Sequence, residues 1–301
     1  MKKRFYSSTL LSFIFLLALA NAASAQSQTF VSAKSGDDIN PCTLELPCRS
    51  FNQAISVVQA RGEVVALSSG DYAPFTVDKS VSVYAAPGVH ASVIATATGT
   101  AVTVSPPAST DRVTLRDLRI NGLTGNTTGI RLLTGKLSVE GCVVENMWIG
   151  IIVEGAGRLY VADTVIRSCS HAVDLVSSIP GKATLERCRL EKNFITGVLV
   201  TNASQVTIRG SVLSGNSSAV RVVENGDPKA EVTLEDCLVT DNVTGIHAEL
   251  AGALVRVSNT TVVGNGTGLN AVNAGAIISR RNNTVEGNTN NGTFTGNFLA
   301  K

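Results

Sequence analysis

The sequence repeats itself about every 23 residues from the middle of the chain almost to its end. Each repeat carries a short alternating segment, such as LERCRL at 185–190. The central positions of these segments are 118, 142, 164, 188, 211, 237, 260 and 283, so that neighbouring centres lie 22 to 26 residues apart. A unit this short cannot bury its own apolar face, so successive units must stack on one another.

Apolar and polar residues alternate within each repeat, and the alternation breaks every few residues. In the repeat around Cys188, positions 183 and 185, 188 and 190, and 198 and 200 hold the inward residues of three short segments. A period of two indicates strands rather than helix. Three strands in each repeat, each about 4.8 Å from its equivalent in the next, predict parallel sheets wound into a coil.

One corner of the predicted coil is marked by a recurring asparagine. It falls five positions after the centre in five repeats, as Asn193, Asn216, Asn242, Asn265 and Asn288. Asn tolerates left-handed backbone, and its amide can hydrogen bond to the Asn of the next coil, so an asparagine ladder is predicted. Several of these residues also fit the Asn-x-Ser/Thr glycosylation pattern, but the regular period favours the structural role. Cys169 occupies the same position and is expected to be a free, partly exposed thiol.

The other cysteines fall into two groups. Cys42 and Cys48 lie six residues apart in a proline-containing loop and are expected to form a disulfide in an oxidising compartment. Cys142, Cys188 and Cys237 occupy repeat centres, where small core residues are expected rather than nucleophiles. Cys142 and Cys188 would lie two coils, about 10 Å, apart, which is too far for a disulfide.

The first residues are typical of a secretory signal peptide. Three basic residues at 2–4 precede an apolar run at 10–20 and the small-residue pattern Ala-Ser-Ala at 23–25. Cleavage after Ala25 is expected, with a retained membrane anchor as the alternative, although the apolar run is too short to span a bilayer. We therefore expect a secreted protein, periplasmic or extracellular.

The charge balance of the mature chain limits its partners. Removal of residues 1–25 takes three of the 25 basic residues and none of the 23 acidic ones, which leaves 22 − 23 = −1. There is no basic surplus for a nucleic acid backbone, so no nucleic acid partner is expected. No later stretch is long and apolar enough for a membrane span, and a monomer is expected.

The segment that follows the predicted cleavage site resembles a known family. The stretches are TFVS at 29–32, GDD at 36–38, NPC at 40–42 and PCRSF at 47–51, with GDY at 70–72 and VSV at 81–83 further on. Together with the repeats they resemble the right-handed parallel β-helix proteins of the pectate-lyase-like superfamily, in particular a mostly uncharacterised group of secreted bacterial members. The resemblance covers nearly all of residues 28–290. It implies an all-β fold, a right-handed parallel β-helix of about nine coils.

The same resemblance implies an amphipathic helix that closes the open end of the coil. Ser50 would cap a helix that runs to about Ala60, and its core-facing residues would be Phe51, Ala54, Ile55 and Val58. We therefore expect a signal peptide at 1–25 and an N-terminal cap with the loop disulfide and the helix at 26–62. The β-helix itself would span 63–290, and a C-terminal tail 291–301.

Enzymes of this superfamily commonly carry their site on the outer face of one sheet. The candidate here is the strand that a Gly or Ala introduces in each repeat. Its first outward column is Arg131, Ile152, Asp174, Leu199, Arg221, His247 and Asn270, and its second is Leu133, Glu154, Val176, Thr201, Val223, Glu249 and Val272. Asp174, Arg221 and His247 are the candidate catalytic residues, because a carboxylate near an Arg or His could bind or activate an acidic sugar.

Four further residues of these columns are candidate ligand-binding residues: Arg131, Glu154, Glu249 and Asn270. The alternative is a solvated surface with chance ion pairs, since half of both columns is apolar. A separate outer column, Glu140, Ala162, Glu186, Arg209 and Glu235, alternates in charge over its last three members. That alternation favours a cross-strand ion-pair ladder that supports the stack.

A calcium ion is the one cofactor that the sequence allows for. Asp37 and Asp38 follow Gly36 and could supply carboxylate ligands to Ca²⁺, although a turn with two carboxylates is the simpler reading. The carboxylate clusters of the calcium-dependent lyases, and the Asp pairs and Gly-His pair of the polygalacturonase-like enzymes, are missing from the predicted sheet.

Three functions remain open. The first is a non-catalytic exported or surface protein that binds a polysaccharide or cell-surface glycan. The second is a polysaccharide lyase, hydrolase or esterase that acts on an acidic polysaccharide such as pectate, and the third is a structural or adhesive rod. Near-constant repeat spacing leaves little chain for loops that would wall a cleft, and Trp148 is the only tryptophan. Binding or structure is therefore favoured over catalysis.

Overall fold

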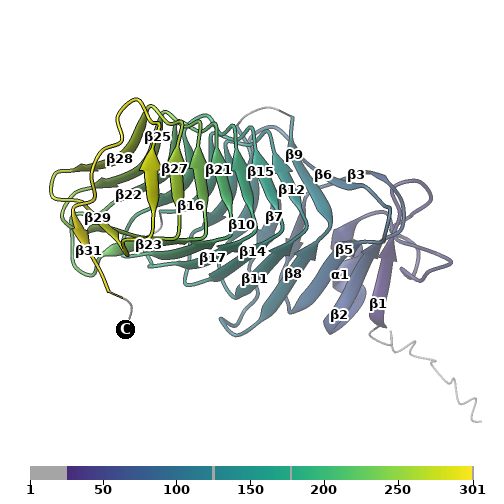
Figure 1. Cartoon of the computed structure of the whole chain (residues 1–301). Coiled ribbons are helices and arrows are strands. Elements are labelled where there is room, and N and C mark those ends of the chain that lie inside the picture. Colours follow the sequence, from purple (N-terminus) through teal and green to yellow (C-terminus); the bar gives the residue numbers. More distant parts are fainter. Residues whose placement is uncertain (1–25, 124–125, 177, 300–301) are drawn as a thin grey trace, which may run out of the picture.

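The stacking that the repeats predict is present along the chain. The structure is a computed structural model that describes residues 26–123, 126–176 and 178–299. Within these residues the chain forms a right-handed parallel β-helix of three parallel sheets, named here sheets A, B and C, with one short helix (Figure 1). Sheet B of this part holds ten strands, one for each turn, so there are about ten turns rather than about nine. The predicted signal peptide lies outside the described residues.

From β2 to β28, each turn contributes one strand to each sheet, in the order A, B, C. Sheet A contains β1 (Gln26–Val31), β2 (Val58–Ala66), β5 (Val81–Ala85), β8 (Arg112–Arg116), β11 (Lys136–Glu140), β14 (Arg158–Ala162), β17 (Lys182–Glu186), β20 (Gln205–Arg209), β23 (Ala230–Glu235), β26 (Ala253–Ser258), β29 (Ala276–Ser279) and β31 (Gly296–Asn297).

Sheet B contains β3 (Gly70–Tyr72), β6 (Ala91–Ala95), β9 (Leu118–Gly122), β12 (Val143–Glu145), β15 (Val165–Arg167), β18 (Arg189–Glu191), β21 (Val212–Ser214), β24 (Leu238–Thr240), β27 (Thr261–Val263) and β30 (Thr284–Glu286). Sheet C contains β4 (Phe75–Val77), β7 (Thr100–Val104), β10 (Thr128–Leu132), β13 (Ile149–Val153), β16 (His171–Leu175), β19 (Thr196–Val200), β22 (Ser218–Val223), β25 (Thr244–Glu249) and β28 (Thr267–Val272).

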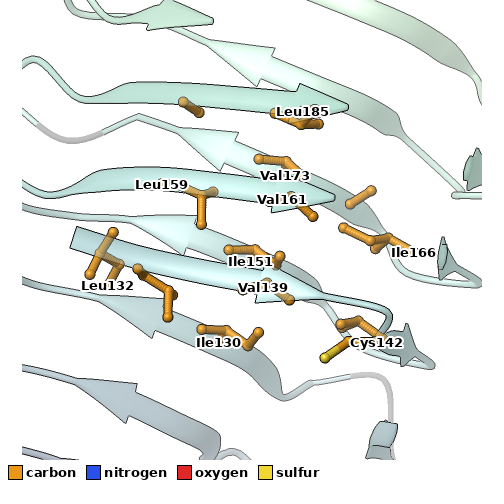
Figure 2. Close-up of a cluster of buried hydrophobic side chains, with 14 of the residues drawn as sticks. Ile130, Leu132, Val139, Cys142, Ile151, Leu159, Val161, Ile166, Val173 and Leu185 are labelled. Atoms are coloured by element: carbon orange, nitrogen blue, oxygen red, sulfur yellow. The ribbon is translucent and has the colours of Figure 1, made fainter. Parts of the chain in front are cut away.

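The core is a stack of inward side chains from successive turns. In sheet C, Ile130 pairs with Ile151, which pairs with Val173, and in sheet A, Val139 pairs with Val161 (Figure 2). All five of these residues are buried. Because the next turn covers each inward residue with its own equivalent residue, the apolar alternation in the sequence is enough to decide which side of each strand faces the core.

Left-handed residues turn the chain at two corners of each coil. From β8 to β27, the residues with positive φ between sheets A and B are Asp117, Gly141, Asp163, Arg187, Gly210, Asp236 and Asn259. From β12 onward, those that follow the strands of sheet B are Asn146, Ser168, Lys192, Gly215, Asp241, Gly264 and Gly287. Gly, Asn and Asp adopt this backbone at the lowest cost, which explains why these residue types recur at the corners.

The predicted asparagine ladder is confirmed at the corner between sheets B and C. The Oδ1 atom of Asn216 accepts hydrogen bonds from the backbone N–H of Asn193 at 3.0 Å and from its Nδ2 at 2.9 Å. The Nδ2 atom of Asn216 donates to Oδ1 of Asn242 at 3.0 Å. The last asparagine, Asn288, donates from its backbone N–H and its Nδ2 to Oδ1 of Asn291. Asn291 therefore supplies, at the C-terminal end, the bonds that a further turn would supply.

The four cysteines within the repeats are free and buried. Cys169 lies at the start of the ladder, as predicted, because its backbone N–H donates to Oδ1 of Asn193. The expectation of a partly exposed thiol was wrong, since the ladder position points into the coil and Cys169 is fully buried. Burial raises the pKa of this thiol to about 12. Cys142, Cys188 and Cys237 are buried at the repeat centres, as predicted for small core residues.

One short helix, α1 (Phe51–Val57), closes the N-terminal end of the coil (Figure 1). The Ser50 side chain accepts a hydrogen bond from the backbone N–H of Gln53, which confirms the predicted cap. Phe51, Ala54 and Ile55 are buried, as the amphipathic pattern predicts.

The helix is shorter than predicted, because the chain after it joins sheet A. Val58 is buried as expected but starts β2 rather than continuing the helix toward Ala60, and it pairs with Gln26 of β1. The predicted disulfide between Cys42 and Cys48 is present in the loop that precedes the helix. Within the described ranges, no helix combines the length and the apolar character needed to cross a membrane.

Candidate functional site

The outer face of sheet C carries the candidate residues in the predicted order. The first column runs in register as Arg131, Ile152, Asp174, Leu199, Arg221, His247 and Asn270. In the second column, Val223 pairs with Glu249 and Glu249 with Val272. Because strands in parallel sheets lie about 4.8 Å apart, neighbouring members of a column are within contact distance.

Four of the candidates form one polar cluster on β22, β25 and β28. An Nη atom of Arg221 donates to the carboxylate of Glu249 at 3.1 Å, and Nε2 of His247 lies 3.3 Å from the same oxygen. The side-chain amide of Asn270 lies 2.9 Å from Nδ1 of His247. Hydrogen bonds from Arg221 and then His247 hold the pKa of the Glu249 carboxyl below its ordinary value. Each group in the cluster is therefore engaged by its neighbours.

Asp174 lies apart from that cluster. Its neighbours in the column are Ile152 and Leu199, and its Oδ1 atom is buried with no hydrogen-bond partner in the described part of the chain. An ionisable group lies close to it on its own strand, where Nδ1 of His171 is 3.6 Å from Oδ1. Burial raises the pKa of the Asp174 carboxyl to about 7. Burial, and then the positive charge of Arg221, lower the pKa of His171.

The three candidate catalytic residues thus fall into two groups. Arg221 and His247 share Glu249, whereas Asp174 faces His171 and two apolar side chains. The remaining candidate ligand-binding residues form a third group at the N-terminal end of the column, where Nε of Arg131 lies 3.3 Å from the carboxylate of Glu154.

The sequence reading missed His171, which lies on the same outer face as Asp174. Residues three apart on a regular strand point to opposite faces, but Ala172 and Val173 are both buried here, which breaks the alternation. Nδ1 of His171 also lies 2.8 Å from the hydroxyl of Thr196 on the next turn. The Gly or Ala that introduces each strand of sheet C could have given the signal. It is a small inward residue that is followed directly by a second inward residue, and two inward residues in succession break the alternation.

Trp148 extends this face at the corner between sheets B and C. Its indole is 46% exposed, and its ring meets the ring of His171 edge-on, with 5.9 Å between the centroids. Trp148 directly precedes β13, so it stands beside the starting end of sheet C. The combination places an exposed aromatic ring, an imidazole and a buried carboxyl next to one another.

The carboxylates proposed as calcium ligands hold the N-terminal loop together. Oδ1 of Asp38 accepts hydrogen bonds from the backbone N–H groups of Arg49 and Ser50, at the start of α1, and Oδ1 of Asp37 accepts from that of Ile39. Across residues 26–123, 126–176 and 178–299, no group of three or more His, Cys, Asp or Glu residues is arranged to hold a metal ion. Calcium binding by Asp37 and Asp38 remains a prediction.

Comparison with known families agrees with this architecture. A family model described as "Right handed beta helix region" matches residues 97–231 and, in a second alignment, 128–290. The chain belongs to this family. Among curated proteins, no relative was found.

Two solved structures resemble the chain in fold. Pectate lyase Pel9A superposes with a TM-score of 0.64 at 16% identity, over 85% of this chain and 75% of that one. XylC, solved as a complex with xylose, superposes with a TM-score of 0.60 at 9% identity, over 85% of this chain and 67% of that one. At these identities the likeness establishes the right-handed β-helix and does not extend to the site.

Proposed function

We propose that the chain is an exported protein that binds a polysaccharide along the outer face of sheet C without cleaving it. The observation that carries the proposal is the exposed ring of Trp148 beside His171 and Asp174. An indole offers a flat apolar surface that a sugar ring can cover, while the neighbouring polar groups can bond to hydroxyls. The two solved structures of similar fold, a pectate lyase and a complex with xylose, support a sugar as the ligand.

The polar cluster beyond Asp174 supports an extended rather than a single-sugar ligand. Arg221, His247 and Asn270 continue the row over three further turns in the direction of the coil axis. A linear polymer that lies along the axis could therefore contact Trp148 at one end and these polar side chains further on. An extended binding mode along the open face of a sheet needs only outward side chains, which sheet C provides.

Binding without turnover is favoured by the state of the polar groups and by the short loops. Arg221 and His247 are already bound to Glu249, whereas a general base or acid must be free to reach a reacting proton. The connections from sheet C to sheet A range from three residues, at 133–135, to seven, at 105–111. Segments this short cannot build the walls that exclude water from a catalytic cleft.

Export is supported by the disulfide between Cys42 and Cys48. Disulfides persist in oxidising compartments such as the periplasm or the extracellular space and are rare where thiols are kept reduced. The N-terminal sequence of the purified protein would test cleavage after Ala25 directly.

Affinity gel electrophoresis in xylan, glucomannan, alginate and polygalacturonate tests the proposal. Trp148→Ala should weaken binding to at least one of these polymers by up to about tenfold, because one aromatic contact contributes roughly 0.5–1.5 kcal/mol. Ile39→Ala, which alters a fully exposed apolar side chain in the distant N-terminal loop, is the matched control and should bind like the parent. If Trp148→Ala migrates like the parent in all four gels, the sheet C site is wrong.

Asp174 favours a second candidate function, a lyase, hydrolase or esterase that acts on an acidic polysaccharide. A carboxyl with a pKa of about 7 and an unpartnered oxygen beside an imidazole has the properties of a general acid or base. The products to measure are unsaturated uronate or reducing ends from polygalacturonate or alginate, and methanol from methyl-esterified polygalacturonate. Release of any of them, lost in Asp174→Asn and retained in Ile39→Ala, would establish this function in place of binding alone.

A further inference from the structure

A ridge of outward side chains follows the asparagine ladder along the corner between sheets B and C. It consists of the residue directly after each ladder position, which gives, in chain order, Trp148, Ser170, Phe194, Ser217, Val243, Gly266 and Thr289. Strand register on both sides of the corner aligns these residues from turn to turn. From this ridge we propose that two copies of the chain associate as an antiparallel dimer, in place of the monomer expected from the sequence.

Large and small side chains alternate along the ridge. The large apolar members are Trp148, Phe194 and Val243, which are 46%, 72% and 67% exposed, and the small members between them are Ser170, Ser217 and Gly266. With about 4.8 Å between turns, one large side chain projects roughly every 10 Å and a recess lies between each pair. Single exposed apolar residues are ordinary on a protein surface, but a line of them with a regular spacing indicates an interaction surface.

The pattern is complementary to itself when the second copy lies antiparallel. A two-fold axis at the level midway between Phe194 and Ser217 places each large residue opposite a small one. The pairs are Phe194 with Ser217, Val243 with Ser170, and Trp148 with Gly266. A parallel two-fold arrangement would instead place every residue opposite its own equivalent, so that Phe194 would meet Phe194 and the recesses would face each other empty. The alternation therefore favours the antiparallel dimer.

The recess at Ser170 is a hollow in the surface. Its volume is about 450 Å³, and its lining includes the hydroxyl side chains of Ser168 and Ser170 and the exposed apolar side chains of Leu123 and Phe194. In the antiparallel arrangement Val243 of the second copy lies opposite Ser170 and enters this hollow. The two-fold axis repeats the contact, so the same hollow on the second copy receives Val243 of the first.

Two unpaired charges beside the ridge fit the same register. Lys192 and Asp241 lie two turns apart at the left-handed corner positions on the sheet B side, and both are exposed. Within the described residues neither forms an ion pair, whereas Arg189 on the same face pairs with Glu191. In the antiparallel dimer Lys192 of each copy lies one turn, about 4.8 Å along the axis, from Asp241 of the other. Two ion pairs across the interface follow from the symmetry.

The size of the ridge determines how strong the dimer should be. The six paired positions span roughly 24 Å along the coil. A contact of this length and one residue wide buries less area than a standard interface of about 1,600 Å², so we expect a reversible dimer with a dissociation constant in the micromolar range. Trp148 belongs both to the ridge and to the sheet C site, and the variants that test the dimer therefore leave it in place.

Sedimentation velocity of the purified protein between about 1 and 200 µM tests the association. The parent should shift from monomer to dimer as its concentration rises, and Phe194→Ser should weaken the dimer by about tenfold or more, because the central apolar contact is lost twice. Ile39→Ser changes a side chain that is 91% exposed in the N-terminal loop, and this matched control should associate like the parent. A parent that stays monomeric at 200 µM, or an equal loss in the two variants, overturns the proposal.

Exchange of the two charges tests the register. Lys192→Asp and Asp241→Lys each bring like charges together across the interface, so each alone should weaken the dimer, and the two combined should restore it. Both substitutions place at a left-handed corner a residue type that this corner already carries with positive φ, so the fold should be retained. A combined variant that is no tighter than either single variant would contradict the proposed pairing.

Cross-linking with a bis-maleimide that spans about 8 Å tests the orientation. In the antiparallel dimer the two Ser217→Cys positions lie one turn apart, whereas the two Thr289→Cys positions lie seven turns, roughly 34 Å, apart. Only Ser217→Cys should give a covalent dimer, and the four native free cysteines are buried and should not react. Equal yields at the two positions would indicate a parallel or random contact and overturn the proposal. Polymer binding by Trp148→Ala is measured separately, so the dimer and the sheet C site can fail independently.

Discussion

Asp174 is a carboxyl on the outer face of a sheet that its neighbours have nevertheless removed from water. It is 3% exposed, because Ile152 and Leu199 flank it in the column and His171 covers it from its own strand. Burial raises its pKa from an ordinary value of 3.8 to about 7. Between those two values the folded chain holds a proton that the unfolded chain has lost. The free energy of unfolding therefore falls as pH rises from about 4 to 7.

Asp174→Asn should remove this dependence, because the amide is neutral at every pH. We expect the variant and the parent to have similar stability at pH 4, and the variant to be more stable by about 1–4 kcal/mol at pH 8. Urea unfolding followed by circular dichroism at the two pH values measures the difference. Asp241→Asn, at an exposed left-handed corner where Asn is equally acceptable, should show no such gain. A constant difference between Asp174→Asn and the parent across this range would contradict the argument.

At the residue scale, the sequence predicted the order of residues in the outer column better than the burial of each side chain. The order of residues from Arg131 to Asn270 in the outer column follows from the repeat alone, and it is confirmed. The burial of Asp174 could not be predicted, since it depends on the size of side chains one turn above and below. His171 was missed because the strand breaks its alternation at Ala172.

The asparagine ladder shows how one corner of the coil satisfies its buried polar groups. From Asn216 onward, each Oδ1 accepts two N–H groups from the turn before. Each Nδ2 reaches a backbone carbonyl one turn back, as Asn216 does with Leu190 at 3.0 Å. The buried N–H and C=O groups at this corner would otherwise lack partners, and each such group costs about 1–3 kcal/mol. The ladder was predictable because it depends on period alone. The burial of Cys169 was not predictable in the same way, because the sequence does not indicate in which direction a free thiol points.

Asn216→Ala should therefore be strongly destabilising. It leaves the backbone N–H of Asn193 without its acceptor and takes one hydrogen bond from the buried carbonyl of Leu190, and we expect a loss of about 3–5 kcal/mol in the free energy of unfolding. The matched variant is Asn288→Ala, at the last rung, where the side chain is half-buried and water can replace the lost bonds. Its loss should stay below about 2 kcal/mol. Equal losses at the two rungs would show that the ladder does not depend on burial.

At the scale of the whole molecule, the coil must protect two open ends. The C-terminal end does so through Asn291, which completes the ladder, and the N-terminal end through α1. The ring of Phe51 lies 4.8 Å from that of Tyr72 and 4.7 Å from that of Phe75, measured between centroids, and so covers the first turn of the core. An uncovered end would expose both apolar core and unpaired strand edges, which are ready sites for association. The capping role was inferred from resemblance, and its contacts required the structure.

Phe51→Ala should loosen the coil from its N-terminal end. Loss of a buried phenyl ring costs about 3–5 kcal/mol, and because each turn contacts only its neighbours, the damage should stay local. Hydrogen exchange followed by mass spectrometry should show faster exchange in β1 to β7 and unchanged protection in β19 to β28. Phe194→Ala, which removes a ring that is 72% exposed, is the matched control and should leave both regions protected. Faster exchange spread evenly over all turns in Phe51→Ala would mean that the coil unfolds as one cooperative unit, and the cap would then contribute to global rather than local stability.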